Sequence, residues 1–273
     1  MDSKKLSIAI DALNRKGNRN FANVFEDFID LALFLLCNNP DENQIKLWNM
    51  VNENKDFKKG FEAAMLEYGK ACEGFQDPLG EIYMDRISSG ELGQYFTPIH
   101  ITDFMAEIAG VKNDSVSDPT CGSGRMLLSA LKVARREEKE PFLYGNDLCP
   151  LCAKMTLLNI LVNTARGEVS CGDTMQQGYD GYKFYHIDRV MIGNVWVSSY
   201  WQFTTQDVDK VNAQRKEWAN KVLEYGGMVE GQQNMTYICP DKSQAITTEK
   251  PAADVLVAKP KAKAVQLDLF EEF

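Results

Sequence analysis

Hydrophobic positions along roughly the first 85 residues recur at helical spacing. In NFANVFEDFIDLALFLLC the apolar side chains fall at 21, 24/25, 28, 31/32 and 35, and FKKGFEAAMLEYGKACEGF repeats the pattern. Apolar residues spaced in this way predict amphipathic helices that bury one face. The alternation typical of strands does not occur there. The sequence therefore predicts a helical N-terminal region, residues 1–88.

From about residue 112 the pattern changes to short apolar runs that alternate with helical stretches. Strands are predicted near 115–118, 142–146, 168–171 and 187–195, and helices near 123–138 and 150–165. A further helix is expected after Thr204 and Thr205, and it should stop at Gly226-Gly227. Alternation of this kind predicts an α/β fold with a parallel, doubly wound sheet. We expect this domain to occupy residues 89–240.

The pattern is lost again after Pro240, and no internal repeat is evident. The segment DKSQAITTEKPAADVLVAKPKAKAV is rich in Ala, Lys, Thr and Pro. It has no apolar periodicity that could build a core, which predicts a flexible tail, residues 241–273.

Composition is that of a globular protein, with 273 residues, 44% hydrophobic and 25% charged. The formal net charge of −9 means that the surface as a whole repels nucleic acid. A DNA partner would need a local basic patch or delivery by another protein. The first residues lack a signal-peptide core, and LALFLLC (31–37) is too short to span a bilayer. Together with seven scattered cysteines, these features predict a cytoplasmic protein without a membrane partner.

The CPLC segment, Cys149 to Cys152, has the spacing of half a zinc site. The chain has only two histidines, and a second close cysteine pair is missing. We therefore expect no metal. In place of a metal site we expect a helix that begins at Pro150 and turns one or both sulfurs inward.

Three predicted strands end on an acid: Asp118 in DPTCGSG, Asp147 in YGNDL and Asp173 in CGDT. The carboxyl ends of parallel strands meet at one edge of a sheet, where ligands bind. The glycine spacing matches neither a dinucleotide site nor a P-loop, and three acids make a poor cradle for pyrophosphate. They suit a cation rich in hydrogen-bond donors, and S-adenosylmethionine offers an ammonium, a ribose diol and an adenine amino group. Helix and turn capping is the alternative role for Asp118 and Asp173.

GQYFTP (93–98), DPTCGSG (118–124), YGNDL and CGDT, in this order, resemble N-6 adenine DNA methyltransferases. The modification subunits of type I restriction systems are the most similar. DPLGEIYMDRI (77–87) resembles the helical segment that leads to the cofactor site of that family. The resemblance covers residues 77–197. It implies a Rossmann-like sheet and methyl transfer from S-adenosylmethionine to adenine in DNA.

The resemblance assigns roles to individual cofactor-binding residues. Tyr95, Phe96 and Thr97 would close over the cofactor, and Asp118 would face its ammonium group. Asp147 would accept from the ribose hydroxyls and Asp173 from the adenine amino group. Gly122 and Gly124 would let the backbone approach closely. Their neighbours Thr120, Cys121, Leu148 and Thr174 complete the expected set.

The target-base element departs from the family pattern. Where the family has Asn/Asp-Pro-Pro-Phe/Tyr, this chain has Asn194, Val195, Trp196 and Val197. The backbone conformation that two prolines impose is lost, and the ring is displaced by one position. The sheet also looks truncated after this point, so a specificity subunit or a second methyltransferase subunit would be needed. A cofactor-binding scaffold without activity is the alternative, and methylation of RNA or protein is a third possibility.

The end of the chain contains Gln266, Leu267, Asp268, Leu269 and Phe270. This pentapeptide resembles the motif by which bacterial proteins dock on the DNA polymerase sliding clamp, with the apolar side chains entering a pocket. Such a partner would bring an acidic protein to DNA. The alternative is an amphipathic end that packs on the core of its own chain.

Overall fold

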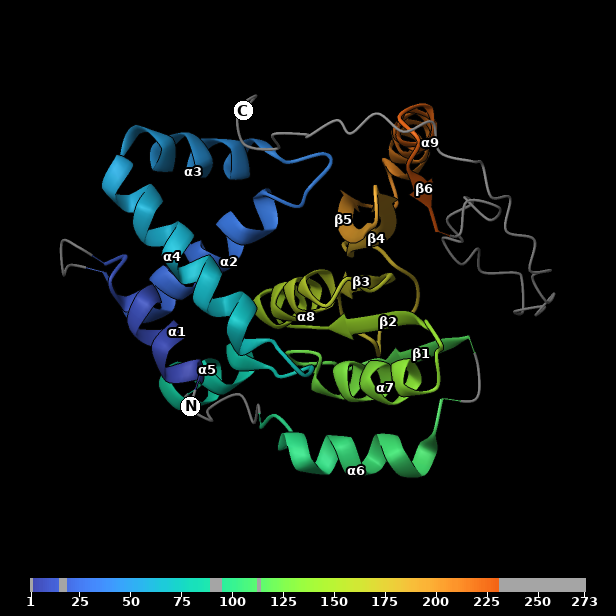
Figure 1. Cartoon of the computed structure of the whole chain (residues 1–273), viewed down its shortest axis with the longest axis horizontal. Helices are drawn as coiled ribbons and strands as arrows, with labels where there is room; N and C mark the ends of the chain where they lie inside the picture. Colours follow the sequence, from blue (N-terminus) through green and yellow to red (C-terminus); the bar gives the residue numbers. More distant parts are fainter. Residues whose placement is uncertain (1, 15–18, 89–94, 112–113, 231–273) are drawn as a thin grey trace.

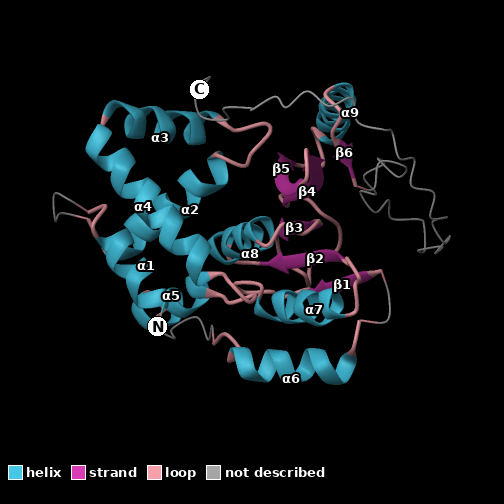
Figure 2. Cartoon of the chain, viewed as in Figure 1, coloured by secondary structure: helices cyan, strands magenta, loops and turns pink. Residues whose placement is uncertain are grey.

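The computed structural model describes residues 2–14, 19–88, 95–111 and 114–230 (Figures 1 and 2). The predicted helical N-terminal region is confirmed. Its helices are α1 (Asp2–Asp11), α2 (Phe21–Phe34), α3 (Glu42–Glu53), α4 (Lys55–Ala71) and α5 (Pro78–Arg86). The remaining described residues form the α/β part of the fold.

The N-terminal helices begin where the sequence supplies capping side chains. Asn20 accepts from the Ala22 amide at the start of α2, at 2.7 Å. Asp41 and Gln44 form a reciprocal capping box at the start of α3. The apolar face of α2 is buried, and the ring of Phe28 packs edge-on against Tyr68 of α4, 6.0 Å between centroids. One hydrophobic core continues from these helices into the sheet.

The α/β part alternates helices and strands over the ranges that the sequence predicts up to residue 171. Its elements are α6 (Ile99–Ala109), β1 (Ser115–Asp118), α7 (Arg125–Arg136), β2 (Phe142–Asp147), α8 (Pro150–Val162), β3 (Gly167–Cys171), β4 (Lys183–Ile192), β5 (Val195–Phe203), α9 (Val208–Glu224) and β6 (Met228–Val229). Pro150 begins α8 as expected, with Cys152 buried on its inner face. The last long helix starts later than predicted, at Val208 after Asp207, and the chain turns at Gly226.

The sheet has the order β1-β2-β3-β4-β5, with β6 also paired to β4. Strands β1, β2 and β3 are parallel, as predicted. From β4 onward the pairing is antiparallel, which corrects the expectation of a parallel sheet throughout. The link between β3 and β4 contains no helix, and a parallel neighbour needs a long crossover connection.

The predicted strand near 187–195 is in fact parts of two strands. Ile192 pairs with Val195, so Gly193 and Asn194 form the two-residue loop of a β-hairpin. Gly193 has a φ of +61°, which this tight turn requires and which side chains disfavour. The other eight residues of β5, 196–203, were not predicted as a strand from the sequence.

Helices cover the two faces of the sheet unequally (Figure 1). Side chains of α7 and α8 share the main core with Leu143 of β2 and Val169 of β3. On the opposite face α9 covers β4 and β5, where Trp218 contacts Trp201 edge-on at 6.0 Å. Over β2 this second face stays partly open, and Tyr144 is 44% exposed there.

The two edges of the sheet also differ. Segment 36–39 lies along the outer edge of β5, where Asn38 donates its amide to the Tyr200 carbonyl at 2.8 Å and Tyr200 donates to Leu36 at 2.9 Å. Within the described residues β1 pairs only with β2. The strand that leads into the glycine turn therefore has a free outer edge in the part of the chain that the structure describes.

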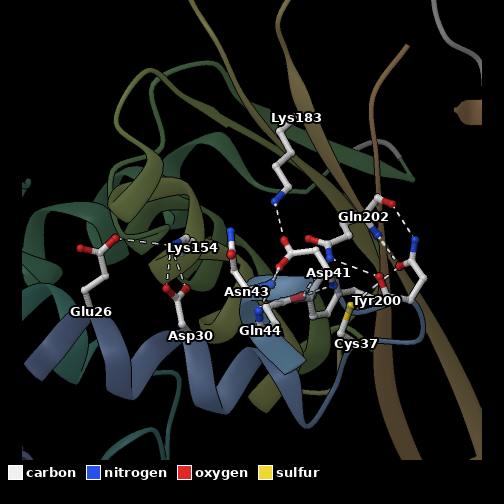
Figure 3. A network of polar contacts seen from close by, with 11 residues as sticks. Glu26, Asp30, Cys37, Asp41, Asn43, Gln44, Lys154, Lys183, Tyr200 and Gln202 are labelled. Atoms are coloured by element: carbon white, nitrogen blue, oxygen red, sulfur yellow. Dashed lines mark hydrogen bonds and ion pairs between the residues drawn. The ribbon is translucent and has the colours of Figure 1, made fainter. Parts of the chain in front are cut away.

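Polar side chains join the N-terminal helices to the α/β part (Figure 3). Lys154 of α8 lies 2.8 Å from Asp30 of α2, and Lys183 of β4 lies 3.6 Å from Asp41. Gln202 of β5 donates to Gln44 of α3 at 2.9 Å. These contacts line a cavity of about 270 Å³. Its acids come from the helical region and its lysines from the α/β part, so the charges are paired across the boundary.

Several predictions fall outside the described residues. They are the tail 241–273, the clamp-like motif from Gln266 to Phe270, and Gly93 and Gln94. The domain boundaries at 88/89 and 240/241 remain predictions. Of the helices that the structure describes, none is long and apolar enough to cross a membrane.

Candidate functional site

The glycine turn connects β1 to α7 at the carboxyl edge of the parallel strands. Gly122 and Gly124 have φ values of +56° and +88°, in the left-handed region that a Cβ disfavours. At Gly124 a Cβ would also lie 3.1 Å from the Thr156 side chain. The Cys121 amide donates to the Asn146 carbonyl at 2.8 Å. The turn is thus held against the end of β2.

A pocket of about 90 Å³ opens beside this turn. It brings together much of the predicted cofactor-binding set. It is lined by Tyr95, Phe96, Thr97, Thr102, Asp118, Thr120, Cys121, Gly122, Ser123, Arg125 and Met126. The enclosed space is smaller than the roughly 300–1,000 Å³ of typical small-molecule sites. A nucleoside-sized ligand would therefore extend out of it or displace its wall.

The wall formed by residues 95–97 lies directly on the turn. The Phe96 ring is so close to Gly122 that a Cβ there would be 2.8 Å from Cε1 of the ring. The ring of Tyr83 in α5 also stacks on the Phe96 ring, with 5.4 Å between the ring centroids. Arg125 adds a cation–π contact at 5.7 Å and donates to the Thr97 carbonyl at 3.3 Å. Segments far apart in sequence therefore hold this wall.

The pocket is acidic on its sheet side. Burial raises the pKa of Asp118 above its ordinary value, the Thr120 amide opposes this shift, and the charge of Asp147 adds to it. A carboxylate destabilised in this way gains most from a bound cation or donor. This set of acceptors fits the positively charged, donor-rich ligand expected from the sequence. No cluster of His, Cys, Asp or Glu suited to a metal ion occurs among the described residues.

Asp147 and Asp173 have structural roles at the same edge. Asp147 accepts from the Gly122 amide at 2.8 Å and from the Cys149 amide at 2.9 Å. Asp173 accepts from the Met175 amide at 2.9 Å, which is the turn-capping role weighed as the alternative. Thr174 donates to the Pro119 carbonyl at 2.8 Å. The loops that follow β1, β2 and β3 are therefore in contact.

Not all predicted cofactor residues lie in the pocket itself. Gly124, within the turn, lies outside its lining. Asp147, Asp173, Thr174 and Leu148 do so as well, with Leu148 70% exposed. They form a rim next to the acidic side of the pocket. This rim offers acceptors and an exposed apolar side chain on the β2–β3 side of the turn.

Sequence reasoning missed a second set of residues that shape the turn. Ser123 and Arg125 both bond to the buried carboxylate of Asp77, and Thr156 donates to the Gly122 carbonyl at 2.8 Å. Asn146 donates to the side chain of Thr174 at 2.8 Å. The available signals were the Asp77-Pro78 start of a helix and an arginine directly after Gly124.

The predicted target-base element lies elsewhere. Because β4 is antiparallel to β3, its carboxyl end points away from the edge that carries Asp118. Ile187 of β4 pairs with Gly167, the first residue of β3. Asn194 lies seven residues further along the chain, which places it roughly 20 Å beyond the amino end of β3. Methyl transfer needs reacting atoms about 3–3.5 Å apart. The structure therefore does not bring Asn194 together with the pocket.

The neighbours of Asn194 are ordinary strand residues. Val195 and Val197 pair with Ile192 and Val190 in the hairpin. The Arg189 guanidinium lies over the Trp196 ring, 4.2 Å from its centroid. This contact and the pairing of Trp196 with Met191 give the ring a structural role in the hairpin.

The sequence profile of the N-6 DNA methylase family matches residues 76–234, which include α5, the pocket and the whole described sheet. The chain belongs to the N-6 DNA methylase family. The match begins one residue before Asp77, so the family signature includes the helix that packs behind the turn. The resemblance inferred from the sequence motifs is thereby confirmed at the level of the family.

Relatives of this family member include proteins of restriction systems. The type I restriction enzyme MjaIX methylase subunit of Methanocaldococcus jannaschii is 28% identical over 147 residues, 52% of this chain and 24% of the relative. The type II restriction enzyme and methyltransferase RM.BcgI of Heyndrickxia coagulans is 36% identical over 121 residues, 37% of this chain and 19% of the relative. The chain thus spans about a quarter or less of these relatives.

Proposed function

We propose that this chain binds S-adenosylmethionine and serves as the cofactor-binding part of an N-6 adenine DNA methyltransferase. The pocket at the end of β1 is the observation that carries the proposal. There an acid of raised pKa, two left-handed glycines and the Tyr95–Thr97 wall meet in a member of the N-6 DNA methylase family. The bound cofactor would supply an electrophilic methyl group.

The described residues can divide the tasks of binding among them. Asp118 would receive the ammonium group, because its carboxylate is half-buried and lies near a second acid. The carboxylate end would face the Thr97 side of the pocket, where Arg125 lies. Asp147 and Asp173, which lie on the rim, would accept from the ribose and the adenine amino group. Phe96 would separate the reacting centre from water.

The methyl-accepting half of the enzyme would come from a second methyltransferase polypeptide. The described sheet ends at β1, beside the pocket, while Asn194 lies at the opposite edge. A partner strand paired to β1 would enter next to Asp118 and could present an adenine there. The matched part is only 24% and 19% of the two relatives, so these relatives contain further sequence beyond it.

Helix α6 offers a surface for the same partner. Its apolar residues Ile101, Phe104, Met105 and Ile108 are 41%, 63%, 47% and 71% exposed, although they recur at helical spacing. The opposite side of α6, with Thr102 and Ala106, is the side that is buried. An apolar stripe of this kind is typical of an interaction site. Its neighbouring charges are paired, Asp103 with Lys132 and Glu107 with Arg136.

Calorimetric titration of the purified chain with S-adenosylmethionine tests the proposal directly. We expect binding by the natural chain and loss of binding in Asp118→Ala. A methyl-transfer assay on DNA, RNA and protein, with the second polypeptide supplied by an extract of the natural cell, then identifies the acceptor, and only DNA adenine agrees with the proposal. Absence of binding by the natural chain, in the presence of an intact fold, would refute it.

A further inference from the structure

Asp77 is a fully buried carboxylate that four donors contact. It accepts from the Gly80 amide at 2.9 Å and from Asn159 Nδ2 at 2.8 Å. It also accepts from Ser123 Oγ at 2.5 Å and from Arg125 Nε at 2.6 Å. Asp77 is only 1% exposed to solvent. A charge removed from water in this way persists only when its acceptor sites are satisfied.

These contacts join the helical region to both sides of the glycine turn. Asp77 is the N-cap of α5, while Ser123 and Arg125 immediately precede and follow Gly124. Asn159 of α8 extends the network, because it also donates to the Ser123 carbonyl at 2.9 Å and accepts from the Tyr68 hydroxyl at 2.8 Å. One carboxylate therefore connects α4, α5, α8 and the turn.

The fit around Asp77 leaves no room for adjustment. At Gly80 a Cβ would lie 2.0 Å from Asp77 Oδ2 and 2.4 Å from Ser123 Oγ. Both distances are far below any contact, so α5 approaches the turn only because residue 80 is glycine. The start of α5 and the glycine turn are thus packed directly against each other, with the carboxylate between them.

The network ends on the wall of the pocket. Arg125 receives its orientation from Asp77 through Nε, and its other end donates to the Thr97 carbonyl and lies over the Phe96 ring. Asp77 does not line the pocket, whereas Ser123, Arg125 and Thr97 do. A change at Asp77 would therefore reach the ligand through residues such as these and not by direct contact.

We infer that Asp77 is a positioning residue for cofactor binding. It fixes the glycine turn through Ser123 and the Tyr95–Thr97 wall through Arg125. The affinity for S-adenosylmethionine consequently depends on the N-terminal helical region. This inference rests on the proposed function, since the ligand is the same.

A purely structural ion pair is the competing explanation, and the chain contains a matched example. Asp188 of β4 is 2% exposed and accepts from Arg215 Nε of α9 at 2.6 Å. It lies under α9, away from the pocket lining. Asp188→Asn should therefore destabilise the fold in a similar way without any effect on the turn.

The experiment compares Asp77→Asn, Asp77→Ala and Asp188→Asn in the full chain. Titration calorimetry with S-adenosylmethionine gives the dissociation constant, and thermal unfolding gives the stability of each variant. We expect Asp77→Ala to weaken binding by about 100-fold and Asp77→Asn, which retains an acceptor for Ser123, by about tenfold. Asp188→Asn should lower the melting temperature and leave the dissociation constant unchanged.

Amide hydrogen exchange over residues 118–128 without ligand provides the second measurement. We expect faster exchange there in both Asp77 variants and not in Asp188→Asn. If Asp77→Ala does not fold, Ser123→Ala removes a single hydrogen bond from the same network and takes its place.

Two results would overturn the inference: natural affinity in folded Asp77 variants, or an equal loss of affinity in Asp188→Asn. A natural chain that binds no S-adenosylmethionine would instead remove the proposed function. In that case unchanged exchange at the turn would refute the positioning role as well, and faster exchange would retain it for whatever ligand the pocket takes.

Discussion

The ring of Phe96 lies across Gly122, with only 2.8 Å between its Cε1 and the place where a Cβ of residue 122 would be. Because Gly122 also has a φ of +56°, its missing side chain serves two purposes. It permits the turn, and it lets the wall of the pocket close on the backbone. The wall and the turn therefore form one unit, although 26 positions separate the two residues.

Gly122→Ala should consequently weaken cofactor binding. The added methyl group must displace the Phe96 ring and strains the backbone, with a cost of roughly 1–3 kcal/mol. Gly110→Ala is a matched control, since Gly110 has a φ of +59° and nothing within 4 Å of its Cβ position. It should show the backbone strain alone. An equal loss of calorimetric affinity in the two variants would contradict this explanation.

Asp118→Asn should stabilise the protein and weaken its binding. Burial raises the pKa of Asp118, so the folded state holds this proton more tightly than the unfolded chain. Ionisation therefore costs stability above the raised pKa, and the cost vanishes below the ordinary value near 3.8. We expect a higher melting temperature for Asp118→Asn at neutral pH and no difference at strongly acidic pH.

Asp188 provides the opposite case for the same measurement. Burial favours its neutral form, but hydrogen bonds from His186 and Arg215 outweigh this and lower the pKa to about 2. Its contribution to stability is thus present above about 3.8 and lost as the pH falls through about 2. Asp188→Asn should destabilise at neutral pH. If Asp118→Asn and Asp188→Asn both raise, or both lower, the melting temperature at neutral pH, the opposite pKa shifts assigned to the two residues are refuted.

The boundary between helices and sheet in Figure 3 yields a further test. Lys154 donates to Asp30, and burial is the main cause that raises the pKa of Asp30. Lys154→Met leaves this largely buried carboxylate without its cation, which should cost about 1–3 kcal/mol. Denaturant unfolding measures the loss. Asp30→Leu in the same chain should restore most of it, because the pair is then replaced by apolar groups.

Local patterns were sufficient for the first part of the fold. Strand ends, the glycine turn and the start of α8 at Pro150 depend on residues close in sequence, and each was predicted. The hairpin at Gly193-Asn194 also had a local signal, since Gly-Asn between apolar runs is typical of a two-residue turn. The family resemblance directed attention to a target-base element instead, and the antiparallel strand was missed.

The Asp77 network could not be predicted in the same way. Asp77 is 46 residues from Ser123 and 82 from Asn159, and periodicity does not reveal which polar groups meet across such separations. Capping preference gives Asp77 a role at the start of α5 and no more. The position of Asn194 could not be predicted either, because it depends on whether β4 runs parallel or antiparallel to β3.

The proposed partner surface leads to the last prediction. Phe104 and Ile108 of α6 are 63% and 71% exposed, so Phe104→Lys and Ile108→Lys remove little buried surface. Both variants should fold and bind S-adenosylmethionine like the natural chain. If a second methyltransferase polypeptide packs on α6, they should nevertheless lose adenine methylation of host DNA when each replaces the natural chain in its cell.

Ile8→Lys is the matched control for these substitutions. Ile8 is 70% exposed on α1, outside the pocket lining and α6, and its replacement should leave methylation intact. Sequencing that detects N6-methyladenine gives the readout, and sedimentation of the purified chain distinguishes a second copy from a different polypeptide. Methylation that survives both α6 substitutions, or that the purified chain performs alone, would show that the pocket obtains its adenine without a partner on this surface.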